Sequence, residues 1–377
     1  MSHAAVINSQ TSPQSGLGLA LAGYGLSLTL PLSTLVFLAT GPHSLGAALL
    51  WTLPVWTLVL ADTWSPPARD NHVPELPSWF FDGLLVVLGG LQIANIFMML
   101  GMVERLGWNS APQAAASLGN LLAIRILVGT ASCCSGIALA HELIHRRSWS
   151  LQWLGRLLLC LVCYDHFTVE HIRGHHSRVG ASDDFATARF GETYSDYFQR
   201  TLVGQFRNAW RLENQRLGFT GFDPHLLRHR VFQGVVVEIL FTLVIGIIWG
   251  PLALAVFLWQ ALAAVRLLEA VNYFQHWGLV RQDKRFRPAD AWTTDSWVTL
   301  HVFLGLSRHA DHHLHARKPY QLLRYRNDGP RLPYGYFGMA FLAKSFNKRY
   351  QALATAELRA RKLGPFANDA QRTSEQA

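Results

Sequence analysis

The chain has little charge for its length. Only 15% of its 377 residues are charged, whereas 50% are hydrophobic, and ordinary soluble domains have roughly 25% charged residues. The shortage of charge argues against a soluble enzyme and indicates an integral membrane protein. The charge that is present has a basic balance, with a formal net charge of +9. Because Lys and Arg flank long apolar stretches, we expect them to face membrane lipid rather than nucleic acid.

Cysteine is scarce, and motifs for electron-carrying cofactors are absent. The four cysteines all lie in apolar stretches, at Cys133, Cys134, Cys160 and Cys163. We expect them to be small buried hydrophobes rather than reactive thiols or metal ligands. The sequence has no GxGxxG fingerprint in a βαβ context, and residues 1–14 show no cleavable signal peptide. Redox chemistry would therefore need electrons from a separate protein.

Long apolar stretches are abundant. Six of them approach or exceed the ~20 residues that cross a bilayer as a helix, at 16–40, 44–61, 79–103, 114–140, 231–250 and 251–274. The shorter stretch 151–164 fits a buried or re-entrant helix, and 337–363 is helix-like. We predict an all-α integral membrane protein with about six transmembrane helices. Residues 1–15 would be loose, 16–363 would form the membrane domain with its polar segments, and 364–377 would be a disordered tail.

Nine of the 17 histidines gather in four short motifs, HELIH, EHIRGHH, NYFQHWG and HADHH. Helical positions i, i+3 and i+4 share one face, so His141 with His145, and His171 with His175, should point the same way. Imidazole is the commonest metal ligand, and burying so many rings without ligands would cost ~1–3 kcal/mol for each unpaired nitrogen. The motifs predict two metal ions held by His141, His145, His171, His175, His176, His276, His309, His312 and His313. For the other histidines we predict structural or surface roles.

Carboxylates near these histidines are expected to accept the second ring N–H and to orient the rings. The candidates are Glu142, Glu170, Asp183, Asp184, Glu269 and Asp311. Glu269 lies two helical turns before His276 inside an apolar stretch, where an ionisable residue is costly and a functional role is the default. We select Glu142, Glu269 and Asp311 as supporting residues. Asp82 and Arg266 could equally be interhelical partners or lie at a solvated helix rim.

The motifs are predicted to share one side of the membrane. With six spans, 114–140 leads into His141 and 251–274 leads into His276 on the side of both termini. Of 33 Lys and Arg, Arg105 lies in the loops of the other side, and Arg125 and Arg266 lie inside spans. The remainder lie on the histidine side, which the positive-inside rule makes cytoplasmic. We predict a multi-pass protein of a bacterial-type inner membrane with its site near the cytoplasmic face.

HELIH, EHIRGHH, NYFQHWG and RHADHH, in this order, resemble the membrane non-haem diiron alkane monooxygenases, and xylene monooxygenases are similar. The resemblance runs over residues 79–342. It implies that the nine histidines hold two irons that use O2 to hydroxylate an unactivated C–H, typically the terminal methyl of a hydrophobic substrate such as an n-alkane. It also implies a rubredoxin or ferredoxin-type electron donor and its reductase. Gln275 matches the xylene type, whereas alkane enzymes usually have Glu.

Three alternative functions remain open. The first is hydroxylation of an aryl methyl group. The second is lipid desaturation, which shares the HxxxH and HxxHH motifs but is disfavoured by NYxxHxG. The third is a non-enzymatic metal transporter, which would place its ligands near the bilayer midplane. For the leading function we expect a substrate channel limited in depth by Trp56 and Leu60. We expect the donor to dock at Arg324 and Arg326, whose reversal to Glu should leave the metal content intact.

Overall fold

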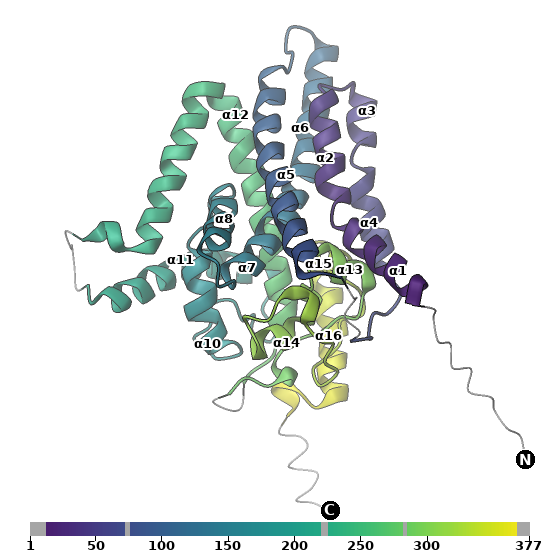
Figure 1. Ribbon diagram of the computed structural model, residues 1–377, viewed down its shortest axis with the longest axis vertical. Helices are drawn as coiled ribbons and strands as arrows, with labels where there is room; N and C mark the ends of the chain where they lie inside the picture. The colour runs from purple at the N-terminus through teal and green to yellow at the C-terminus, as the bar shows by residue number, and fades with distance from the viewer. Residues whose placement is uncertain (1–12, 72–75, 220–224, 282–284, 368–377) are drawn as a thin grey trace, which may run out of the picture.

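The computed structural model describes residues 13–71, 76–219, 225–281 and 285–367, and these ranges are helical, with no strand beyond isolated bridges. Long apolar helices form a bundle at one end of the molecule, and shorter helices gather at the other end (Figure 1). The bundle contains α1 (Pro13–Leu26), α2 (Thr29–Thr40), α3 (Leu45–Leu50), α4 (Leu53–Thr63), α5 (Ser78–Glu104), α6 (Ala111–Ala131) and α12 (Arg230–His276). The all-α prediction is confirmed.

The six predicted apolar stretches are all helical. Among the described residues, four helices are long and apolar enough to cross a membrane, and the pair Ala20–Leu26 and Thr29–Thr40, bent by 44°, would make five if it is one span. One of the four, α12, doubles back on itself at Gly250, where φ is 79° and the following residue is Pro251 (Figure 1). A positive φ suits glycine, and proline cannot continue the hydrogen-bonding pattern of a helix. The two arms of α12 therefore correspond to the two stretches predicted on either side of Gly250.

One long helix leads from the bundle to the histidine side. α6 begins at the N-cap Ser110, whose hydroxyl accepts a hydrogen bond from the backbone N–H of Gln113. It runs through the π-helical turn η1 (Ser132–Ile137) into α7 (Ala138–Ile144). The whole of 111–144 is one membrane-span candidate. Its last turn presents His141, as the sequence predicts.

The shorter elements lie at the end opposite the α12 turn (Figure 1). They include the predicted short helix, α8, and a long helix, α11, that was not predicted from the sequence. In chain order they are α8 (Trp149–Cys160), α9 (Phe167–Val169), η2 (Glu170–His175), α10 (His176–Arg178), α11 (Tyr194–Leu217), η3 (Leu226–Arg228), η4 (Pro288–Asp290), α13 (Trp297–Val302), η5 (Leu306–Arg308), α14 (His309–Leu314), η6 (Tyr320–Leu322), α15 (Tyr336–Ser345), α16 (Asn347–Arg361) and η7 (Gly364–Phe366).

A buried carboxylate joins the bundle to these elements. Asp62, at the end of α4, accepts hydrogen bonds from the hydroxyls of Ser296 at 2.5 Å and Thr299 at 2.7 Å, and from the backbone N–H of Phe337 at 2.8 Å. Because an unpaired carboxylate would be expensive at a buried position, these bonds fix the end of α4 against α13 and α15.

Two expectations are wrong, one about Trp56 and Leu60 and one about the start of the predicted tail. Trp56 is 43% exposed and Leu60 is 54% exposed, so they face outward on α4 and do not line an internal channel. Part of the predicted tail is also ordered, because Gly364–Phe366 form a 3-10 turn and Phe366 contacts the ring of Phe190. Residues 1–12 and 368–377, the remainder of the two terminal segments, lie outside the described residues. The four cysteines are unpaired and mostly buried, as expected.

Candidate metal centre

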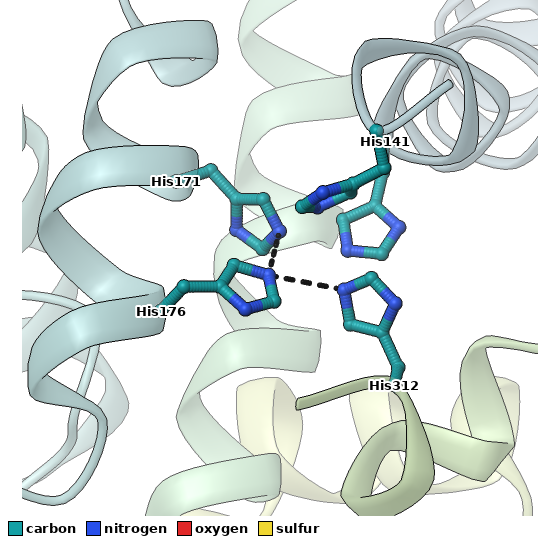
Figure 2. Close-up of side chains that lie close together, drawn as sticks. His141, His171, His176 and His312 are labelled. Carbon is teal, nitrogen blue, oxygen red and sulfur yellow. Dashed lines mark hydrogen bonds between the residues drawn. The ribbon is translucent and has the colours of Figure 1, made fainter. Parts of the chain in front are cut away.

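The nine predicted histidines come together in two groups, which lie side by side. The five-histidine group contains His141, His145, His171, His176 and His312, and the four-histidine group contains His175, His276, His309 and His313. Within each group the potential ligand nitrogens all lie within 4.8 Å of one another. In Figure 2 the rings of His141, His171, His176 and His312 point toward a common centre from segments far apart in the sequence.

The distances between ring nitrogens match those between ligands of one ion. In the five-histidine group, Nε2 of His176 lies 3.0 Å from Nε2 of His171 and 3.1 Å from Nε2 of His312. In the four-histidine group, Nε2 of His309 lies 2.9 Å from Nε2 of both His276 and His313. Nitrogens bound at ~2.0–2.1 Å to one metal, at right or tetrahedral angles, lie roughly 2.9–3.4 Å apart.

Several nitrogens in the groups have no other partner. The Nε2 atoms of His141 and His145 are buried without a hydrogen bond to any described residue. Such orphaned acceptors cost ~1–3 kcal/mol each, and a metal ion would satisfy them. The residues present therefore fit a pair of divalent metal ions.

The charge state of the rings suits metal binding. Burial, with repulsion from neighbouring imidazoles, holds the pKa of His171, His309 and His312 well below its usual value. Burial lowers the pKa of His145 to about 4, with a smaller contribution from Arg317. The rings are therefore neutral near pH 7, the form in which imidazole binds a metal.

The backbone distributes the histidines differently from a regular helix. His141 and His145 share a group at i, i+4 as predicted, and His309 and His313 do the same. His171 and His175 do not, because η2 is a π-helical turn and brings position i+5, His176, beside His171. Since a π turn has one extra residue, the expected pairing of His171 with His175 is wrong.

Asp184 orients one of the rings. Its carboxylate accepts a hydrogen bond from Nδ1 of His175 at 2.9 Å, from the hydroxyl of Thr187 at 2.6 Å and from the backbone N–H of Ala186 at 3.1 Å. The Nδ1 contact leaves Nε2 of His175 to face the four-histidine group, an arrangement typical of metal-binding histidines. Although burial opposes it, His175 and the hydrogen bonds lower the pKa of Asp184.

The three selected carboxylates brace the segments that present the histidines. Asp311 accepts bonds from Lys318 at 2.8 Å, Arg326 at 2.7 Å and the backbone N–H of Arg324 at 3.0 Å. Glu142 pairs with Arg146 at 2.8 Å. In the described part of the chain, neither these two nor Glu269 has a hydrogen bond to a grouped imidazole. Of the candidates named from the sequence, Asp184 makes that contact.

Glu269 and Glu170 are held by α11, a contribution that sequence reasoning missed. The hydroxyls of Tyr164 and Tyr197 donate to Glu269 at 2.9 and 3.0 Å, and Gln205 donates at 3.2 Å. One turn further along α11, Asn208 donates to both oxygens of Glu170 at 2.9 and 2.7 Å. The available signal was the spacing of Tyr197, Thr201, Gln205 and Asn208, which places polar groups on one helical face.

Comparison with known proteins identifies the family. A family model described as fatty acid desaturase matches residues 116–342. Alkane 1-monooxygenase 2 of Pseudomonas aeruginosa is 34% identical over 78% of each chain. Alkane 1-monooxygenase 2 of Alcanivorax borkumensis is 30% identical over 87% of this chain and 89% of its own. The xylene/toluene monooxygenase hydroxylase component of Pseudomonas putida is more distant, at 25% identity over 77% and 75%.

The chain belongs to the alkane monooxygenase family. As a member, it is a multi-pass membrane oxidoreductase, and its two histidine groups are consistent with metal binding. Other histidines of this alkane monooxygenase lie outside both groups. His301 bonds through Nδ1 to the carbonyl of Trp297 at 2.8 Å, and His166 packs against Tyr164.

Proposed function

We propose that this alkane monooxygenase uses two irons, O2 and two electrons to hydroxylate the terminal methyl of an n-alkane. The reaction balances as R–H + O2 + 2 e⁻ + 2 H⁺ giving R–OH + H2O. The observation that supports the proposal most directly is the meeting of nine imidazoles in two groups at the ends of membrane helices. Alkane hydroxylation is supported by the curated relatives, which are named alkane 1-monooxygenases.

The nine histidines would be the ligands, with five on one iron and four on the other. Imidazole and non-haem iron are a common combination, and iron supplies the O2 activation that amino-acid side chains lack. The protein's own contribution is positional. Asp184 fixes the ring of His175, and α6 and α12 bring His141 and His276 from the bilayer to the site. An alkane dissolved in the membrane would approach along the same apolar helices.

We propose that the site lies near the cytoplasmic face of a bacterial inner membrane and receives electrons from a rubredoxin or ferredoxin-type protein. The sequence supports both parts, because nearly all Lys and Arg lie on the histidine side and the chain has no electron-carrying motif of its own.

The experiment combines metal analysis with product identification. The purified chain should contain two irons and, given a rubredoxin, its reductase and NADH, should convert octane to 1-octanol. Parallel reactions with p-xylene and a fatty acid distinguish aryl-methyl hydroxylation and desaturation. Metal uptake into vesicles without O2-dependent product would instead support a transporter. Product without bound iron, or octane left unchanged while another substrate reacts, would contradict the proposal.

A further inference from the structure

Three cations lie close together beside the membrane bundle without a carboxylate partner. They are Arg125 on α6, Arg266 on α12 and Lys344 on α15. In the described part of the chain, no carboxylate oxygen is within 4 Å of any of them. The guanidinium of Arg125 instead lies over the ring of Trp259 at 5.5 Å, and that of Arg266 over Phe198 at 4.9 Å.

Arg125 and Arg266 lie at the contact between α6 and α12, where a Cβ at Gly129 would come within 2.5 Å of the Cβ of Ala263, one turn before Arg266, and within 3.5 Å of a guanidinium nitrogen of Arg125. Arg266 is close enough to Arg125 to repel it. Although Lys344 is exposed at its surface, partial burial of the ammonium lowers its pKa to about 8, and repulsion from Arg266 and Arg125 adds to the shift. A guanidinium nitrogen of Arg125 lies beside Gly129, one turn nearer the histidine side. Uncompensated charges of one sign are costly in a membrane protein, so the cluster calls for an anion.

Arg266 lies in the half of its α12 arm that is nearer the histidines, and exposed apolar side chains lie beside the cluster. Arg266 precedes His276 by ten residues, which is ~15 Å of helix. Large apolar side chains surround the charges at the surface, with Trp259 40%, Leu262 44%, Phe341 47% and Phe346 55% exposed. An anion at this place would therefore have hydrocarbon beside it, as a phospholipid headgroup does.

We propose that Arg125, Arg266 and Lys344 bind the phosphate of an anionic phospholipid from the leaflet on the histidine side. The aromatic rings cover one face of each guanidinium and leave its N–H edge for phosphate oxygens, to which arginine can donate two hydrogen bonds at once. The acyl chains would lie along the exposed apolar side chains. Because α6 leads to His141 and α12 leads to His276, the bound phosphate would also relieve repulsion between the two helices that deliver these ligands.

The test compares the full-length chain in nanodiscs of phosphatidylcholine alone and of phosphatidylcholine with phosphatidylglycerol. We expect phosphatidylglycerol to raise the melting temperature by at least about 3 °C and native mass spectrometry to retain one bound phosphatidylglycerol. In the double variant Arg125→Gln/Arg266→Gln, the shift and the bound lipid should both be lost. In phosphatidylcholine alone, the same variant should be at least as stable as the wild type, because it has lost the repulsion.

Three further arms keep the proposal falsifiable. Arg266→Lys, which keeps the charge, should retain part of the lipid effect. Lys362→Gln, which removes one cation at the C-terminal end of α16, should behave as wild type. Inorganic phosphate added to phosphatidylcholine discs should have no effect. An equal phosphatidylglycerol shift in wild type and the double variant would overturn the site, and stabilisation by inorganic phosphate alone would overturn the lipid as its ligand.

Discussion

His312 belongs to a different histidine group from the other two histidines of its motif. It lies on α14 between His309 and His313, yet it joins the five-histidine group, 3.1 Å from His176, while they join the four-histidine group. We expect His312→Ala to lose metal from the five-histidine group and to abolish hydroxylation. His315→Ala is the control, because His315 is exposed and directly follows α14. This variant should keep both the metal and the hydroxylation activity. Full iron content and turnover in His312→Ala would remove it from the ligand set.

Asp184 offers a second test at the scale of one residue. Asp184→Asn keeps the shape of the side chain but weakens the acceptor for Nδ1 of His175. Losses of this kind typically reduce metal affinity 10–100-fold, so we expect iron to be removed by a chelator at a lower concentration while the fold, measured by circular dichroism, is unchanged. Asp183→Asn is the matched control, because the Asp183 side chain is 62% exposed. Equal chelator sensitivity in the two variants would contradict an orienting role.

The sequence could predict which histidines come together, because four short motifs contain all nine of them, but it could not predict their hydrogen-bond partners. HELIH places two imidazoles on one face of any helix, whatever the tertiary fold. The contact of Asp184 with His175 depends on how the loop after α10 returns, and the sequence gives no measure of that. Glu142 and Asp311 are directly adjacent to histidines in the sequence, closer than Asp184 is, but the fold turns them toward Arg146 and Arg326.

At the scale of the element, η2 depends on a glycine. A side chain at Gly174 would meet the carboxylate of Glu170, which Asn208 holds at both oxygens. Gly to Ala within a helix normally stabilises by roughly 0.5–1 kcal/mol. We expect Gly174→Ala instead to lower the free energy of unfolding and to release metal, because the new methyl group displaces Glu170, the residue before His171. Gly90→Ala on α5, where nothing lies within 4 Å, should follow the normal sign in thermal unfolding. A Gly174→Ala variant as stable and metal-loaded as wild type would show that η2 tolerates the shift.

The segment after α14 is the second element with a testable role. The buried Asp311 between His309 and His312 is paired with Lys318 and Arg326. Arg326→Glu would leave a buried carboxylate beside a second negative charge, and breaking a buried pair typically costs about 3–5 kcal/mol. We therefore expect loss of metal, contrary to our prediction from the sequence that reversal would spare it. Arg326→Lys, which keeps the positive charge, should retain most of the metal, as measured by inductively coupled plasma mass spectrometry.

The boundary of an element could be predicted from the sequence where a strong local signal marks it. Gly250-Pro251 marks a reversal that no continuous helix could contain, and the structure has it. The π turns η1 and η2 were not predicted, because one inserted residue changes the phase of a helix without changing its composition. The α11 helix was missed since its buried face is polar, and a hydrophobic period cannot reveal a face made of Tyr, Thr, Gln and Asn.

At the scale of the whole molecule, charge is separated from the apolar bundle, and this governs how an electron donor would arrive. The guanidinium of Arg326 forms an ion pair with Asp311. Arg324 donates only its backbone N–H to Asp311, and its side chain is exposed. Arg317 is also exposed and lies close enough to affect His145. A donor that docks there would reach the five-histidine group directly, and an acidic one would be steered by these charges.

We therefore expect Arg317→Glu/Arg324→Glu to lower kcat/KM for the protein donor by about tenfold at low salt, with iron content unchanged. The difference from wild type should shrink as salt is added, because screening shortens the reach of the charges to ~8 Å at physiological ionic strength. A small chemical reductant, which needs no docking, should support both proteins equally. Arg349→Glu/Arg359→Glu, at two exposed arginines of α16, makes the same change of charge and is the control. If the two double variants lose the same activity, net charge rather than the surface at Arg317 and Arg324 steers the donor, and if neither loses any, docking does not depend on these arginines.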